Sequence, residues 1–341
     1  MSFQAVRARA ARAGLHAPVA WLRNCGLDPA DVLVASHGRS GDTMLRFILG
    51  EILSGVPSSF DNIQRIVPEI GLQLNAYPIL PGNGRLIKTH EPYCRAYKRA
   101  IYLIRDVRDA MLSFFARETA VGAIHPSHSN LDDYVLPFMQ GKLSHFGSWQ
   151  SHVASWMNSP LAQSGDLLVV RFEDMREDTE TWITRCLEFL GKQVDASVIQ
   201  AAIRNNSLEK MRDKEQQSKR LAKISGDGRQ INKGVIGRWR QTLTERQLRI
   251  VDQYAGDTLA RFGYPSGING QPAEQEHPEK TAQQRRNFVD TGILPVRNAG
   301  TGRSPQVSAV NLDDEAHPSA NRALRIRMGG RIANFFSWYR Y

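Results

Sequence analysis

The chain has 341 residues, of which 41% are hydrophobic and 23% charged, the composition of an ordinary globular protein. No window approaches the roughly 18–20 uninterrupted apolar residues of a membrane span, and residues 1–23 carry four arginines without the apolar core of a secretory signal. The net charge of +10 favours anionic partners, but the arginines are scattered and no nucleic-acid motif occurs, which argues against nucleic acid. Cys25, Cys94 and Cys186 lack metal-ligand spacing and suit a reducing cytoplasm, where we expect the protein to lie.

Apolar runs alternate with helical patterns along the chain. The runs predict short strands at 32–36, 86–89, 100–105 and 167–172. Helices are expected from the turn after residue 36 to about residue 53, and at 107–117, 178–190 and 244–262. Because continuous apolar strands alternate with helices, we expect an α/β fold with a parallel sheet covered on both faces. Residues 207–233 are polar and interrupted by glycines, and we expect a mobile segment there, a candidate lid.

The turn at 36–43, Ser-His-Gly-Arg-Ser-Gly-Asp-Thr, joins the first strand to a helix. Glycines let backbone N–H groups at a helix start approach an anion, and Arg39, Ser40 and Thr43 add further donors. The turn is not a Walker A loop, because only two residues separate its glycines and Asp42 stands where the lysine would be. An ordinary strand-to-helix turn is the alternative. Since ligands of parallel sheets bind beyond the strand ends, 88–90 and 105–113 are candidate sites too.

Four segments, in order, resemble sulfotransferases that use 3′-phosphoadenosine-5′-phosphosulfate (PAPS), of the cytosolic, bacterial-like type. The resemblance spans about residues 31–264 and implies a P-loop-NTPase-like parallel sheet flanked by helices, the sulfotransferase fold. Its most specific segment is the third, with an arginine and a serine eight residues apart. The segments are the turn from His37 to Thr43, Lys88-Thr89-His90-Glu91-Pro92, the stretch from Tyr102 to Ser113, and Lys233-Gly234-Val235-Ile236-Gly237-Arg238-Trp239.

The resemblance implies a sulfuryl transfer from PAPS to a hydroxyl or amine acceptor, without a metal. His90 is then the general base, since a neutral imidazole suits proton removal near pH 7. Lys88 and Arg39 would offset charge on the sulfuryl and leaving oxygens, and Arg105 with Ser113 would bind the 3′-phosphate. An isolated histidine would more often be structural, and an isolated Arg105 would more often form a salt bridge with Asp106 or Asp109. The expected cofactor-binding residues are Arg39, Ser40, Gly41, Asp42, Thr43, Arg105, Ser113, Ser207, Lys233 and Gly234.

Some positions depart from the family's pattern. Arg39 stands where lysine is common, and Met44 replaces an aromatic residue that often stacks on adenine. Asp42 places a carboxylate beside an anionic cofactor, and we expect it to cap the helix and pair with Arg46. In the fourth segment Asn232 replaces an arginine of the 3′-phosphate clamp and Gln230 an aromatic residue, with Arg229 as a possible substitute for the arginine.

The predicted organisation is a helical extension at 1–30, a sulfotransferase domain at 31–264 and a poorly ordered tail at 265–341. The expected partner is a small-molecule, glycan or lipid hydroxyl acceptor. A homodimer stays open, as does weak contact between the basic, aromatic tail and a membrane surface. Two alternatives to the sulfotransferase remain: a P-loop-type small-molecule kinase using ATP and Mg²⁺, and a non-catalytic nucleotide-binding relative. The sequence does not name the acceptor.

Overall fold

The computed structural model describes residues 23–144, 146–222 and 234–267. Its four strands are β1 (Val32–Ser36), β2 (Leu86–Thr89), β3 (Ala100–Ile104) and β4 (Leu167–Arg171). They form one sheet in the order β2-β1-β3-β4, and every neighbouring pair is parallel. The predicted α/β fold with a parallel sheet is therefore confirmed. β3 and β4 each end one residue before the predicted limit, so that Arg105 follows β3 and Phe172 begins a helix.

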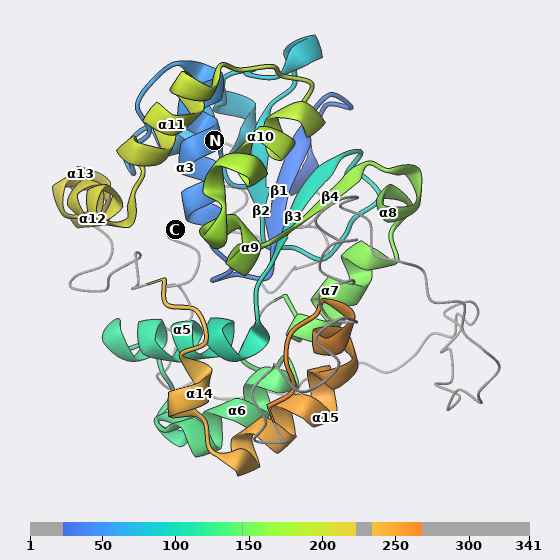
Figure 1. Ribbon diagram of the computed structural model, residues 1–341, viewed down its shortest axis with the longest axis vertical. Coiled ribbons are helices and arrows are strands. Elements are labelled where there is room, and N and C mark those ends of the chain that lie inside the picture. The colour runs from blue at the N-terminus through green and yellow to red at the C-terminus, as the bar shows by residue number, and fades with distance from the viewer. Residues whose placement is uncertain (1–22, 145, 223–233, 268–341) are drawn as a thin grey trace, which may run out of the picture. The chain divides into compact units, whose positions relative to one another are not determined.

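The strands are buried along almost their whole length, which explains why they appear in the sequence as continuous apolar runs. Helices α3, α10 and α11 pack against one another beside the sheet, whereas α5, α6 and α15 form a second group that Figure 1 shows beyond the point where β3 leaves the sheet. The main helices are α3 (Asp42–Ser54), α5 (Val107–Ala120), α6 (Leu131–Met139), α7 (Trp149–Met157), α10 (Thr179–Phe189), α11 (Ala196–Asn205), α12 (Leu208–Gln217) and α15 (Glu245–Arg261). Shorter ones are α4 (Ile63–Ile66), α8 (Pro160–Ser164), α9 (Phe172–Glu177), α13 (Lys219–Ala222), α14 (Trp239–Thr242) and the 3₁₀ turns η1 (Gln73–Asn75), η2 (Pro81–Asn83) and η3 (Pro126–His128).

The predicted helices are confirmed, and side chains at their ends explain the limits. Thr244 caps α15 and forms a capping box with Gln247, which satisfies two backbone N–H groups. Asp178 accepts a hydrogen bond from the Thr181 N–H at the start of α10. Within the described part of the chain, no helix is long and apolar enough to cross a membrane.

The first part of the segment from residue 207 that we expect to be mobile is helical. α12 and α13 occupy 208–222, whereas 223–233 lie outside the described residues. α12 was missed because its sequence is almost wholly polar and so lacks an apolar stripe. Its start is set by Ser207, which accepts from the Lys210 N–H, and Met211 is the buried side chain that attaches it to the domain.

Candidate active site

The shape of the turn between β1 and α3 depends on two residues with a left-handed backbone conformation. Gly41 has a φ of 92° and Arg39 a φ of 61°, both in the left-handed region. The Ser40 hydroxyl donates to the His37 carbonyl oxygen across the turn, at 2.7 Å. A side chain at position 41 would collide with the Phe172 ring. A Cβ at Gly38 would lie 2.9 Å from the Phe114 ring on α5. The sequence predicts that the two glycines give an anion access to the backbone. They also let the turn pack closely on α5 and α9.

Asp42 does not cap α3, and this expectation is wrong. Gly41 takes the cap position, so Asp42 becomes the first helical residue. Its carboxylate crosses instead to β2, where Oδ2 lies 3.4 Å from the Lys88 Nζ. Burial would raise the pKa of Asp42, but the charges of Lys88, His90 and Arg46 outweigh this effect and lower it to about 2. The expected pairing of Asp42 with Arg46 is present as an electrostatic attraction, which helps to lower the pKa of Asp42.

His90 directly follows β2 and is oriented by β1. Its Nδ1 lies 2.8 Å from the Ser36 carbonyl oxygen. A carbonyl oxygen only accepts, so Nδ1 carries the proton and Nε2 keeps its lone pair. The Nε2 atom lies 3.9 Å from Asp42 Oδ2. Burial, with a smaller contribution from the Lys88 charge, lowers the pKa of His90 and keeps the ring neutral at pH 7.

Arg39, Arg105 and Ser113, predicted from separate segments, lie in contact. Arg39 Nε donates to Ser113 Oγ at 3.0 Å, and Arg105 Nη1 donates to the Arg39 carbonyl oxygen at 3.1 Å. The Arg105 guanidinium also lies over the Phe172 ring, 4.4 Å from its centroid. Within the described residues Arg105 forms no ion pair, and the neighbouring Asp106 pairs with Arg108 instead. The salt-bridge alternative for Arg105 is therefore wrong.

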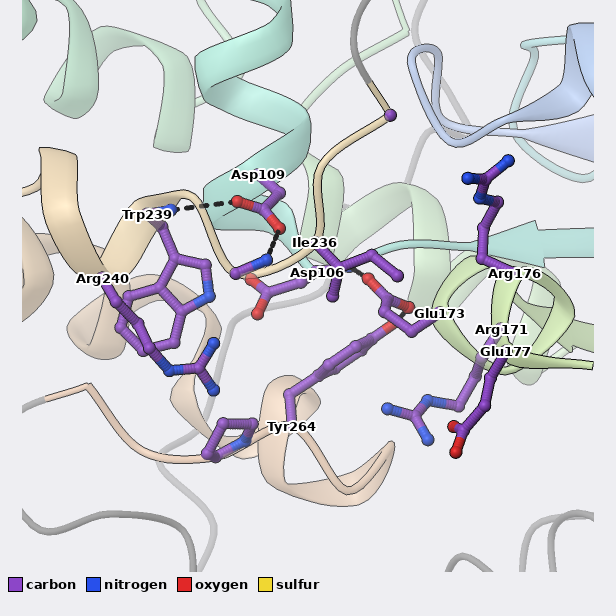
Figure 2. Close-up of a pocket in the computed structure, with 13 residues that line it drawn as sticks. Asp106, Asp109, Arg171, Glu173, Arg176, Glu177, Ile236, Trp239, Arg240 and Tyr264 are labelled. Carbon is purple, nitrogen blue, oxygen red and sulfur yellow. Dashed lines mark hydrogen bonds between the residues drawn. The ribbon is translucent and has the colours of Figure 1, made fainter. Parts of the chain in front are cut away.

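The fourth segment of the resemblance contacts Arg105 and the start of α5. Arg105 Nη2 donates to the Val235 carbonyl oxygen at 3.1 Å. The Asp109 carboxylate accepts from the backbone N–H groups of Gly237, at 2.6 Å, and Trp239, at 3.1 Å, as Figure 2 shows. These bonds place the described part of the segment, from Gly234 onward, beside the start of α5. The expected residue Lys233, the substituted Asn232 and Gln230, and Arg229 lie outside the described residues.

A cavity of about 380 Å³ opens beside this loop (Figure 2). Glu173 closes its floor by accepting from the Asp106 N–H and the Tyr264 hydroxyl. Arg176, on its far side, reaches the Met44 sulfur at 3.7 Å, which connects the cavity wall with the start of α3. The lining residues are Asp106, Asp109, Arg171, Glu173, Arg176, Glu177, Gly234, Ile236, Gly237, Trp239, Arg240, Tyr264 and Pro265.

Two further histidines support the site and were missed in the sequence. His152 in α7 donates from Nε2 to the His90 carbonyl oxygen at 3.1 Å, and its Nδ1 lies 2.9 Å from the Tyr102 hydroxyl. His37 contacts Gly147 through Nε2 at 3.4 Å and packs edge-on against the His152 ring. The sequence signal was the Gly147-Ser148-Trp149 stretch, whose link to the turn depends on contacts between distant segments. Ser207, an expected cofactor residue, is exposed and caps α12.

The described residues fit a ligand with negative charge at both ends, as PAPS has. Burial is the main effect that lowers the pKa of Arg39 to about 10, and the charges of Arg117 and Arg105 add to it, whereas those of Asp42 and Glu215 oppose it. The Nε atom of Arg105, a residue only 7% exposed, has no hydrogen-bond partner among the residues that the structure describes. An anion between such groups would relieve their repulsion. No group of three or more His, Cys, Asp or Glu among the described residues is arranged to hold a metal.

A parallel sheet whose first strand leads through a glycine-containing turn into a helix, with basic residues at the neighbouring strand ends, is typical of proteins that bind nucleotides at the carboxyl ends of their strands. A family model described as a sulfotransferase domain matches residues 29–263, and the chain belongs to this family. Mouse sulfotransferase 1A1 is 25% identical over 254 residues, covering 68% of this chain and 86% of the relative. Mouse sulfotransferase 2A1 is 28% identical over 254 residues, covering 70% and 86%.

Solved structures confirm the fold. Retinol dehydratase in complex with androsterone and the inactive cofactor PAP superposes with a TM-score of 0.57 at 23% identity, covering 70% of this chain and 83% of that one. Mouse sulfotransferase SULT7A1 complexed with PAP gives 0.52 at 21% identity, covering 70% and 88%. The chain is thus a PAPS-dependent sulfotransferase, which moves a sulfuryl group from PAPS to an acceptor.

Proposed function

We propose that the acceptor is a hydroxyl or amine group of a small molecule, and that His90 is the general base. The observation that supports this role most is the hydrogen bond between His90 Nδ1 and the Ser36 carbonyl oxygen. It leaves the Nε2 lone pair on the side of Asp42 and Lys88, beside the turn proposed to bind the phosphosulfate. A neutral, oriented imidazole is the form that removes a proton near pH 7.

The proposed step moves one proton and one sulfuryl group. The acceptor's proton passes to His90 Nε2 while the acceptor oxygen or nitrogen forms a bond to sulfur. The bond from sulfur to the bridging oxygen breaks, and its electron pair stays on the 5′-phosphate of adenosine 3′,5′-bisphosphate (PAP). Lys88 and Arg39 would offset the negative charge that grows on the sulfuryl and leaving oxygens.

The other predicted residues would hold the nucleotide. Backbone N–H groups from Ser40 to the start of α3, with the Thr43 hydroxyl, would bind the 5′-phosphosulfate, while the Ser40 hydroxyl donates to the His37 carbonyl oxygen and holds the turn. Arg105 and Ser113 would bind the 3′-phosphate, with Ser207, Lys233 and Gly234 as further contacts to the cofactor. Among relatives, the retinol dehydratase structures name retinol and androsterone as ligands, which supports a small-molecule alcohol here. A cytoplasmic location, a homodimer and membrane-surface contact by the tail stay predictions.

The test is transfer of labelled sulfate from PAPS to a panel of small alcohols and amines. His90→Ala should reduce turnover by about 10²–10⁴-fold, the usual contribution of a general base. PAP binding, measured by calorimetry, should change little, because the acceptor rather than the nucleotide meets Nε2. His125→Ala, which changes an exposed histidine, is the control. Near-normal turnover in His90→Ala would remove His90 from the role, and binding of Mg-ATP but not PAP would favour the kinase alternative.

A further inference from the structure

The side chain of Asp42 lies at the reacting end of the proposed site. The residue is 5% exposed, and its Oδ2 lies 3.4 Å from Lys88 Nζ and 3.9 Å from His90 Nε2. Lys88 contacts a second carboxylate, that of Glu69, at 3.6 Å. The negative charge of Asp42 is unfavourable beside an anionic cofactor, because it repels phosphate. Its position suggests a second effect of that charge.

We infer that Asp42 is a positioning residue for proton removal: its carboxylate fixes Lys88 and provides the counter-charge for the imidazolium that His90 becomes when Nε2 takes the acceptor's proton. This rests on the proposed role of His90 as general base. The distance of 3.9 Å is too long for a hydrogen bond but is well within the range of a strong charge–charge interaction in a buried site. The interaction is weak while the ring is neutral and strong once it is charged.

The direction of the effect follows from the groups that surround His90. Lys88, on the same strand end, disfavours the imidazolium, whereas burial lowers the pKa of His37 in the turn and of His152 in α7, so that both rings are neutral near pH 7. Asp42 from α3 favours the charged ring, and Glu69 favours it less strongly. Asp42 is therefore the main anion that opposes burial and Lys88, and without it His90 would be a weaker base.

The charge of Asp42 should also repel the phosphate groups of the nucleotide. Removing this charge should therefore raise the affinity for the nucleotide and lower kcat. In Asp42→Asn the side chain keeps its shape but loses its charge. PAP should bind more tightly because a repulsion is removed. The kcat should nevertheless fall by about tenfold, because the imidazolium loses its counter-charge. A purely structural residue at the start of α3 would change thermal stability without this opposition.

The decisive measurement is an NMR titration of the His90 ring nitrogens in the PAP complex, which needs no turnover. The His90 titration should move to lower pH in Asp42→Asn and return towards the parent in Asp42→Glu. The acid limb of the kcat–pH profile should move in the same direction. Glu69→Gln, which also removes a carboxylate from Lys88, is the matched control and should give a smaller shift.

An unchanged His90 titration in Asp42→Asn, or an equal shift in Glu69→Gln, would overturn the inference. The proposed base fails in a different way: His90 would then titrate as described while His90→Ala still turned over normally. If neither kcat nor the titration responds in Asp42→Asn but the melting temperature falls, Asp42 acts only on the start of α3.

Discussion

Arg39 lies in one of the two proposed phosphate sites and contacts residues of the other. It belongs to the turn after β1, yet its Nε donates to Ser113 on α5, and its carbonyl oxygen accepts from Arg105. The φ of 61° at Arg39 turns the backbone so that both contacts form. We therefore expect a substitution at Arg39 to change the rate of sulfuryl transfer as well as the affinity for the nucleotide.

We predict that Arg39→Ala lowers kcat more than it raises the KM for PAPS, the result expected when an interaction is made mainly in the transition state. Arg39→Lys should keep much of the activity, because the charge is retained. Steady-state kinetics on both variants check this. An unchanged kcat in Arg39→Ala would mean that the guanidinium is only a structural partner of Ser113.

The 3′-phosphate is tested with two nucleotides that differ only in that group. Arg105→Ala and Ser113→Ala should each weaken PAP, by about 1.5–3 kcal/mol for a charge-assisted hydrogen bond. Adenosine 5′-phosphate should bind almost as well to the variants as to the parent, since it has nothing to contact these side chains. Calorimetry gives both affinities. Equal losses for the two nucleotides would show that Arg105 and Ser113 support the Val235 loop and the turn rather than reading the 3′-phosphate.

At the scale of elements, the turn between β1 and α3 depends on contact with α9. Gly41→Ala adds a methyl group directly against the Phe172 ring at a φ of 92°. We expect it to lower the melting temperature and PAP affinity together, because either Phe172 or the start of α3 must move. Gly55→Ala is a matched control: its φ of 69° is strained as well, but nothing lies within 4 Å of the added atom. Comparable losses in both variants would assign the effect to backbone strain alone.

The elements that the sequence predicted well are those whose signal is local. The strand that ends at Ser36 is an apolar run, and the long helix at the end of the domain starts at a capping box and ends at Arg261, just before Gly263. The polar helix α12 carries no such signal and was missed. The sequence predicted which residues belong to the candidate site, because the family's motifs placed His90 and Arg105 at strand ends. Which side chains meet was not predictable, because the Asp42–Lys88 and Asp109–Gly237 contacts depend on how distant segments pack.

At the scale of the whole molecule, buried neutral histidines make stability depend on pH. Burial, aided by the His90 charge, lowers the pKa of His37 to about 4, and burial also lowers the pKa of His90 and His152. The unfolded chain therefore binds more protons than the native one below about pH 6.5. The stability from these residues is complete above that pH and is lost as the pH falls towards 4.

We predict that melting temperatures fall steeply between pH 7 and pH 4.5, and that His37→Phe flattens this dependence. His37 packs among Phe114 and Phe138, its Nδ1 has no hydrogen-bond partner within the described part of the chain, and its pKa shift corresponds to about 3 kcal/mol. Calorimetric or circular-dichroism melts across this pH range provide the check, with the exposed His125→Asn as control. A dependence as steep as the parent's in His37→Phe would exclude His37 as a source.

The limits of the domain remain a prediction. The family match ends at residue 263, and the described residues end at 267. The helical extension expected at 1–30 lies mostly, and the tail expected at 265–341 almost entirely, outside the described residues. Limited proteolysis followed by mass spectrometry would locate both limits.

The bond from His90 to the Ser36 carbonyl oxygen has a consequence for the order of events in the proposed reaction. A backbone carbonyl cannot take up a proton and pass it on, and the other polar group that the described residues place at Nδ1 is the Ser36 hydroxyl, at 3.2 Å. A proton that enters through Nε2 would therefore leave either through this hydroxyl or through Nε2 itself. Where it leaves through Nε2, His90 would be discharged only after the sulfated product has left that side of the ring.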